Sequence, residues 1–223
     1  MNKNILVVAS HPDDEAIGCG GTIAKHVEKK DFVHLVFMSD GVTSRKSSSK
    51  KELKLRTNAA NLSASILGVT SVSYLKFPDN KMDSVPFLEI VQKLEAIFIN
   101  LKPSVVYTHH HGDLNIDHQL THNAVITVCR PLPNSIVSEI YGFEVLSSTE
   151  WSNPLKSTFK PTLFIDITKY LSKKLNSVNA YKQEMRDVPH SRSIKHIEIL
   201  AQHRGYSVGV DMAEAFEVYR IIH

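Results

Sequence analysis

The chain has few cysteines, no long apolar run and no block of basic residues. Its two cysteines among 223 residues are too few for a disulfide framework. No apolar segment approaches the length of a membrane span, and no charged stretch leads into a long apolar one at the N-terminus. These features argue against a disulfide-rich secreted protein and predict a cytoplasmic protein without stable membrane insertion.

The charge balance gives no sign of a nucleic-acid partner. Lysine and arginine total 26 against 23 acidic residues, a net charge of +3, and no basic cluster exceeds a pair. Residues 18–21 (GCGG) lack the G-x-G-x-x-G spacing of a dinucleotide site, and the acids before them would repel a pyrophosphate. We therefore expect neither nucleic acid nor a nucleotide cofactor.

Apolar runs that predict strands alternate with segments that predict helices. The predicted strands are 5–9, 32–38, 72–75, 105–108, 136–140, 143–146, 163–167 and 216–222. The predicted helices are 21–29, 52–67, 86–100, 118–129, 171–185 and 193–203. This alternation implies βαβ units and a mostly parallel sheet. We predict one α/β domain over residues 1–223, with a Rossmann-like sheet flanked by helices.

Acidic residues and a histidine gather directly after the first predicted strand. Residues 10–15 (SHPDDE) place one imidazole and three carboxylates at its C-terminal end, where open α/β sheets bind ligands. Such close like charges repel unless a cation lies among them or one carboxylate is protonated. Histidine and carboxylate are ordinary zinc ligands, so the segment indicates half of a metal site. A polar turn with an aspartate N-cap is the alternative.

A second polar cluster follows the strand predicted at 105–108. Residues 109–118 read HHHGDLNIDH, and Asp117 is expected to cap a helix that begins at His118. This arrangement would place His118 at the same sheet edge as His11. A site with ligands from both loops, three in all, is typical of catalytic rather than structural zinc.

These segments resemble the motifs of the PIG-L/LmbE-like N-acetylglucosaminyl deacetylases. Residues 11–15 (HPDDE) with 18–22 (GCGGT) are similar to the first motif of that family, and 113–118 (DLNIDH) to the second. Arg204-Gly205 and 213–216 (AEAF) match a third motif. Residues 147–151 (SSTEW) and 189–193 (PHSRS) look like those of a bacterial subgroup associated with sugar and surface-polysaccharide genes. The resemblance covers nearly the whole chain.

The resemblance implies that His11, Asp14 and His118 bind one zinc per chain and that Asp13 is the general base. Zinc lowers the pKa of its water and polarises an amide carbonyl, while a nearby carboxylate moves the proton to the leaving amine. Other divalent metals, such as iron or cobalt, would also suit two histidines and one carboxylate. Glu15 is expected at the helix start or in a supporting position.

The sequence departs from the family pattern at Asn115, where many members have a histidine thought to stabilise the oxyanion. Asparagine can donate a hydrogen bond there but cannot act as an acid. Asn115 therefore stays in the predicted catalytic set, and His190 or His110 is a candidate for the acid role. His109 and His111 are expected to be polar loop residues, and Asp117 a histidine partner or an N-cap.

Four side chains are candidates for holding the substrate: Arg56, Asp79, Arg130 and Arg192. Arg56 stands where the family has an arginine thought to face the substrate or the acetate product. The glutamate usually found three residues later is Ala59 here, so a paired role for Arg56 is in doubt. The other three could bind sugar hydroxyls or a phosphate, or serve in salt bridges and turns. Trp151 could stack on a sugar ring or lie in the core.

The resulting prediction is a zinc-dependent hydrolase that removes the acetyl group from an N-acetylated amino sugar, releasing acetate and a free amine. The sugar could be free, lipid-linked or nucleotide-linked. The alternatives are a zinc amidase for a non-sugar or thiol-conjugate amide, and a zinc- or sugar-binding protein without catalysis. Asp13 argues against the last, because binding alone needs no base. The expected partner is a small amino sugar, with a homo-oligomer as an alternative to a monomer.

Overall fold

The computed structural model of the protein describes residues 2–45, 48–133, 135–155 and 157–222. Its strands are β1 (Asn4–Ala9), β2 (Phe32–Ser39), β3 (Ser71–Phe77), β4 (Val105–His109), β5 (Glu139–Phe143), β6 (Leu163–Asp166) and β7 (Ala213–Ile221). Its α-helices are α1 (Asp14–Glu28), α2 (Lys50–Leu67), α3 (Phe87–Leu101), α4 (Ile116–Val128), α5 (Leu171–Asn179) and α6 (Ile194–Tyr206). Two short 3-10 helices are η1 (Met82–Ser84) and η2 (Thr168–Tyr170).

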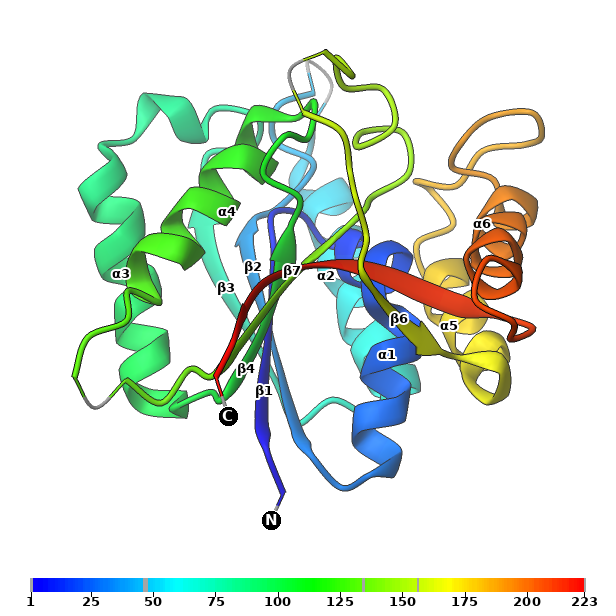
Figure 1. Ribbon diagram of the computed structural model, residues 1–223. Coiled ribbons are helices and arrows are strands. Elements are labelled where there is room, and N and C mark those ends of the chain that lie inside the picture. The colour runs from blue at the N-terminus through cyan, green and yellow to red at the C-terminus, as the bar shows by residue number, and fades with distance from the viewer. Residues whose placement is uncertain (1, 46–47, 134, 156, 223) are drawn as a thin grey trace.

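The described strands form one sheet in the order β3-β2-β1-β4-β5-β7-β6 (Figure 1). Strands β1 to β5 are parallel, whereas β7 runs antiparallel to both of its neighbours. The chain builds outward from β1 to β3 and then returns to the other side of β1 with β4. Ligands of open α/β sheets bind at such a reversal, beyond the C-terminal ends of the strands. The predicted Rossmann-like, mostly parallel single domain is confirmed.

Helices cover both faces of the sheet, and alternate residues of each strand pack on opposite faces. In β1, Ile5 and Val7 join a core cluster with residues of α1, α2 and α5, while Leu6 and Val8 join a cluster with α3 and α4. Figure 1 shows the same division, with α3 and α4 together on one side. Because both faces are buried, β1 reads as a continuous apolar run, which is why the sequence revealed it.

Several element boundaries differ from those predicted. Helix α1 begins at Asp14 rather than at residue 21, and it contains a kink at Cys19, whose φ of −145° is not helical. Helix α5 ends at Asn179, well before residue 185, and Tyr181 beyond its end donates its hydroxyl to Glu15 in the core. Only one strand, β5 (Glu139–Phe143), stands where two were predicted at 136–140 and 143–146, and residues 136–138 and 144–146 belong to no strand.

Glu214 of β7 fixes the kinked part of α1 to the sheet. Its carboxylate accepts hydrogen bonds from the backbone N–H groups of Gly21 and Thr22, at 2.9 and 2.7 Å. It also forms a buried ion pair with Lys174 of α5, which donates to the carbonyl of Ile17 at 2.7 Å. Glu214, which belongs to the third motif of the sequence, therefore has a structural role: it connects α1, α5 and β7.

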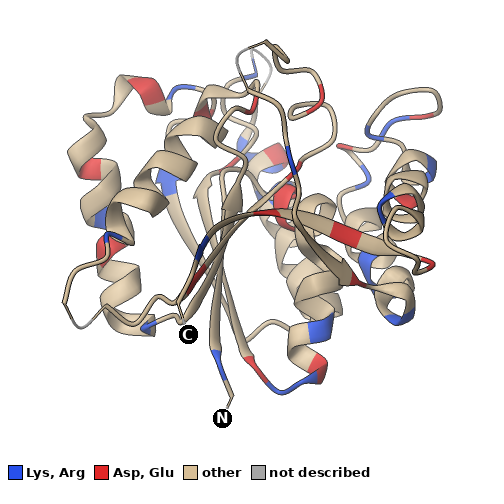
Figure 2. Ribbon diagram, viewed as in Figure 1, with Lys and Arg blue, Asp and Glu red and all other residues tan. Residues whose placement is uncertain are grey.

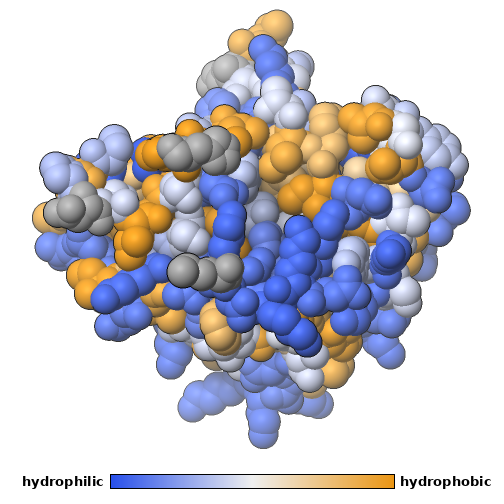
Figure 3. All heavy atoms as spheres, turned by 60° about the horizontal axis from the view of Figure 1, so that its bottom comes forward, coloured by the Kyte–Doolittle hydropathy of each residue, from blue (hydrophilic) through white to orange (hydrophobic). Residues whose placement is uncertain are grey.

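The surface carries both charge signs. Lysine, arginine and acidic residues are interspersed over the helices (Figure 2). The face seen when the bottom of Figure 1 is brought forward carries hydrophilic side chains at its centre and lower edge, with hydrophobic ones among them toward the top and sides (Figure 3). Among the described residues, no helix combines the length and apolarity needed to cross a bilayer.

We predict that Glu214→Ala lowers the free energy of unfolding by about 3–5 kcal/mol, because it leaves Lys174 buried without a counter-charge. Urea denaturation would measure the loss. The matched control is Glu198→Ala, which breaks the exposed Lys195–Glu198 pair and should cost less than about 0.5 kcal/mol. Equal unfolding midpoints for Glu214→Ala and the wild type would contradict the structural role of this pair.

Candidate metal centre and active site

The two polar clusters meet where β1 and β4 end. The backbone N–H of Ser10 donates to Nε2 of His109 at 2.8 Å, and the hydroxyls of Ser10 and Thr121 lie 2.8 Å apart. These contacts hold the loop after β1 against β4 and the first turns of α4. His118 is buried in that helix and faces His11, as the sequence predicted.

Three donor atoms form a nearly equilateral triangle. Nδ1 of His11 lies 3.4 Å from Oδ2 of Asp14, and Nε2 of His118 lies 3.3 Å from each of these atoms. Ligands bound at about 2.0–2.1 Å to a tetrahedral zinc lie about 3.4 Å apart. The three side chains therefore fit a cation of this size, and three protein ligands leave one position open for water or substrate.

Charge balance supports a cation among these groups. Burial lowers the pKa of His11, but hydrogen bonds with Asp117 and Asp14 raise it to about 9. Burial likewise opposes protonation of His118, yet Asp14 and Asp113 raise its pKa to about 10. The pKa of Asp14 is held well below its usual value by the two histidines, despite its burial. The buried carboxylates thus require positive charge, which either protons or a metal ion can supply.

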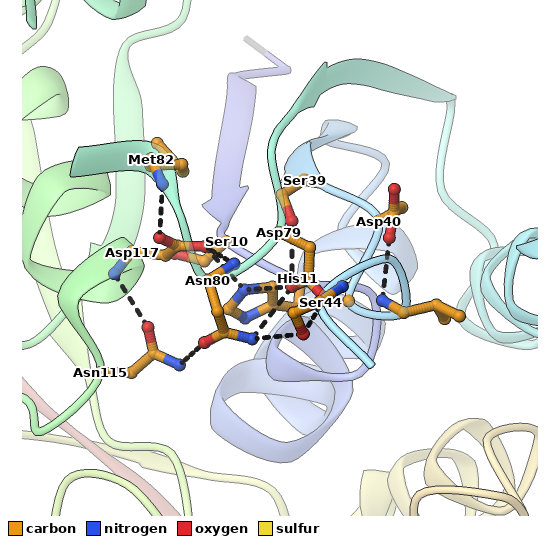
Figure 4. A network of polar contacts seen from close by, with 12 residues as sticks. Ser10, His11, Ser39, Asp40, Ser44, Asp79, Asn80, Met82, Asn115 and Asp117 are labelled. Carbon is orange, nitrogen blue, oxygen red and sulfur yellow. Dashed lines mark hydrogen bonds and ion pairs between the residues drawn. The ribbon is translucent and has the colours of Figure 1, made fainter. Parts of the chain in front are cut away.

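Carboxylates hold both histidines from behind. Nδ1 of His118 lies 3.2 Å from Oδ1 of Asp113, and Nε2 of His11 lies 3.2 Å from Asp117 and 3.3 Å from Asp79 (Figure 4). Such partners fix the tautomer and the orientation of a ligating imidazole. The role of Asp113 was missed from the sequence, although its distance of five residues from His118 could have suggested it.

The start of α4 differs from the prediction. The N-cap is Asn115 and not Asp117: its side-chain oxygen accepts from the N–H of Asp117 at 2.8 Å, and its amide donates to Asn80 at 2.9 Å. With the helix beginning earlier, Asp117 lies in the first turn and points toward His11 (Figure 4). Both ends of the Asn115 amide are therefore engaged in holding the loop.

Asp13 is buried beside the triangle in a strained backbone conformation. Its φ of 119° is rare for a residue other than glycine, and such strain persists only where the surroundings enforce it. Its Oδ2 lies 2.9 Å from Arg192 and 3.3 Å from Arg56, and its N–H donates to Glu15. Oδ1 has no hydrogen-bond partner in the described protein. Burial raises the pKa of Asp13, and the two arginines oppose that shift.

Arg56 is buried and pairs with a carboxylate that the sequence did not reveal. Glu184 lies 2.9 Å from Arg56 and also accepts two hydrogen bonds from Arg45, each 2.8 Å long. The chain thus lacks a glutamate at position 59 but gains the pairing carboxylate from the segment after α5. No local pattern around Glu184 could have indicated this contact, because its partner is far away in the sequence.

The other predicted substrate residues occupy very different places. Arg192 reaches Asp13, whereas Asp79 is buried behind His11 and accepts hydrogen bonds from Ser44. Arg130 is exposed beyond the far end of α4, a helix whose thirteen residues span about 20 Å. The structure does not bring Arg130 to the site.

His190 and Trp151 lie together near the site. Both are exposed, and their rings meet edge to face with centroids 5.9 Å apart. Nδ1 of His190 accepts a hydrogen bond from the N–H of Arg192 at 2.9 Å. Trp151 is 53% exposed, so its alternative role as a core residue is wrong.

The three consecutive histidines have separate environments. His109 is the last residue of β4, fully buried and stacked on His118 with ring centroids 3.9 Å apart, so it is not a loop residue. His110 is buried and donates to Glu217 at 2.7 Å, while His111 is exposed. Glu217 also accepts hydrogen bonds from Tyr219 and from the N–H of Lys160. The carboxylate of Glu217 beside His110 is therefore already satisfied by donors of the protein.

The fold and the site define an α/β protein with a two-histidine, one-aspartate centre, and comparison with known proteins places it in a family. The family model described as PIG-L, GlcNAc-PI de-N-acetylase, matches residues 6–129, which include both motifs. The match spans more than half of the chain, and the chain belongs to this family of de-N-acetylases.

Relatives of this chain carry deacetylase names. The "uncharacterized deacetylase YaiS" of Escherichia coli (strain K12) is 29% identical over 192 residues, covering 81% of this chain and 91% of that protein. A diacetylchitobiose deacetylase of Thermococcus kodakarensis is 29% identical over 192 residues, covering 82% of this chain and 70% of the relative. These names support an enzyme of the hydrolase class.

The fold alone does not define the reaction. Solved structures with this fold include deacetylases and a hydratase. GalB, the 4-carboxy-2-hydroxymuconate hydratase of Pseudomonas putida KT2440, superposes with a TM-score of 0.76 at 23% identity, covering 99% of this chain and 98% of GalB. The reaction must therefore be argued from the side chains of the site.

Proposed function

We propose that the protein is a zinc-dependent N-deacetylase of an N-acetylated amino sugar, with His11, Asp14 and His118 as the zinc ligands. The observation that carries the proposal is the buried triangle of donor atoms with the strained carboxylate of Asp13 beside it. The names of the family and of the diacetylchitobiose deacetylase support an N-acetylated sugar as substrate.

A zinc ion in this centre would supply Lewis acidity, lowering the pKa of a water molecule and polarising the amide carbonyl. Asp13 then acts as the proton carrier. Its Oδ1 is free to accept a proton from the attacking water and to pass it to the nitrogen as the C–N bond breaks. Water and amide thereby give acetate and a free amine.

Arg56 and Arg192 orient this proton carrier by holding Oδ2 of Asp13, which leaves Oδ1 as the oxygen without a hydrogen-bond partner among the described residues. Glu184 in turn holds Arg56, and the N–H bond to Glu15 keeps the backbone of Asp13 in place. Asn115 uses one of its two side-chain N–H groups to hold Asn80. In this proposal Asp13 serves as both base and acid, so the proton is carried by neither Asn115 nor His190.

We predict that the wild type binds about one zinc per chain and releases acetate from N-acetylated sugars. Asp13→Asn should retain the metal but lower kcat by about 10²–10⁴-fold, because proton transfer is lost. His118→Ala should lose both metal and activity, while the control His111→Ala, an exposed histidine of the same segment, should keep both. Elemental analysis and an acetate assay on a panel of N-acetylated sugars and UDP-sugars would measure these outcomes.

Two results would contradict the proposal in different ways. Zinc binding without cleavage of any sugar amide in the panel would leave the metal centre standing and exclude the sugar deacetylase. Full activity of Asp13→Asn would show that another group carries the proton.

We also predict that Asp113→Asn weakens zinc binding by about 10–100-fold, because it removes the carboxylate that orients His118. Competition with a chromophoric chelator would measure the affinity. Glu217→Gln is the matched control, since Glu217 also holds a histidine, His110, but lies outside the triangle. Equal affinities for the two variants would mean that the contact between Asp113 and His118 has no role in metal binding.

A further inference from the structure

Trp151 and His190 form an exposed pair of rings, which we call the rim pair. They come from two segments, residues 147–151 and 187–193, that lie far apart in the sequence. The ring planes meet at 71°, and Trp151 keeps 53% of its surface exposed. It is the single tryptophan of the chain. The proton transfer described above uses neither ring.

Both segments are anchored to the metal centre. Ser148 and Thr149 donate to the carboxylate of Asp113, the residue behind His118. Trp151 follows Ser148 by three residues, a distance of at most about 11 Å along the chain.

On the other segment, Arg192 donates to Asp13 at 2.9 Å and lies two residues from His190. Its Nε also donates to the hydroxyl of Ser147 at 2.6 Å, which joins the two segments. The rim pair is thus held close to the site by contacts with the general base and with a partner of a metal ligand.

The position of the rim pair separates it from the reacting sugar. The three candidate ligands are each at most 7% exposed, so the acetamido group must enter a buried site to react. A ring that contacts the exposed Trp151 therefore belongs to a neighbouring unit of the substrate and not to the one being deacetylated.

The chemistry of the surroundings favours a sugar at this position. A pyranose offers an apolar C–H face to an aromatic ring and hydroxyl groups around its edge. The same two segments carry polar groups, namely the carboxylate of Glu150, the hydroxyl of Ser191 and the guanidinium of Arg192. The exposed apolar side chains of Leu155 and Val188 also lie in or near these segments. A second copy of the protein is therefore the alternative binding partner for this surface.

We propose that the rim pair binds a second sugar ring by stacking on Trp151, so that the substrate is a disaccharide or longer saccharide. This inference rests on the proposed deacetylase function and specifies its substrate class. His190 packs against Trp151 and positions the indole.

The single tryptophan allows a direct test of binding that does not depend on turnover. In the zinc-loaded Asp13→Asn variant, N,N′-diacetylchitobiose should change the Trp151 emission in a saturable manner. N-acetylglucosamine should do so only at concentrations at least about tenfold higher. An unchanged emission at saturating disaccharide would overturn the inference, as would an emission that follows protein concentration and not sugar, which would indicate contact between copies.

Kinetics provide the second readout. Trp151→Ala should raise KM for the disaccharide about tenfold with kcat changed less than twofold, and it should leave KM for the monosaccharide unchanged. Trp151→Phe should recover most of the loss. The control Phe32→Ala removes an exposed aromatic at the first residue of β2, at the opposite end of the sheet, and should have no effect.

The two proposals fail separately. Unchanged disaccharide KM in Trp151→Ala, with acetate still released, would overturn the rim pair and leave the deacetylase intact. Saturable emission changes in a protein that releases no acetate would support the saccharide site and exclude the deacetylase.

Discussion

The structure depends on placing several carboxylates and imidazoles together out of water. Asp13, Asp14, Asp113 and Asp117 are all buried within one network, and isolated buried charges are too costly to persist. The network is stable because each negative charge faces a histidine, an arginine or backbone N–H groups. The sheet supports it by ending two adjacent strands, β1 and β4, at the same point.

This arrangement separates two kinds of carboxylate that are neighbours in the sequence. Asp14 points at the histidines, whereas the positive φ of Asp13 turns its side chain toward two arginines. Asp14 can then ligate a cation while Asp13 remains free for proton transfer. The surroundings hold Asp13 in this strained conformation, which is a feature often found at functional sites.

The sequence predicted the parts of the fold and site that arise from local patterns. Buried parallel strands read as apolar runs, and the polar segments after β1 and β4 stood out against them, which drew attention to His11, His118 and the adjacent aspartates. The choice of Asp14 over Asp13 as a predicted ligand came from the family resemblance. Contacts between distant segments have no such pattern. Glu184 lies in the segment after α5 and pairs with Arg56, which is distant in the sequence. Arg130 was predicted to bind substrate but lies outside the site, because it follows the far end of α4.

Under the two proposals, the chemistry and the choice of substrate come from different parts of the chain. The first half of the chain, through α4, supplies the metal triangle and Asp13, while the second half supplies Arg192, Glu184 and the rim pair. The two halves meet through a few side-chain contacts, such as that of Thr149 with Asp113. Under the two proposals, changes in residues 147–151 or 187–193 that keep these contacts would alter the saccharide that binds and leave the candidate metal ligands in place.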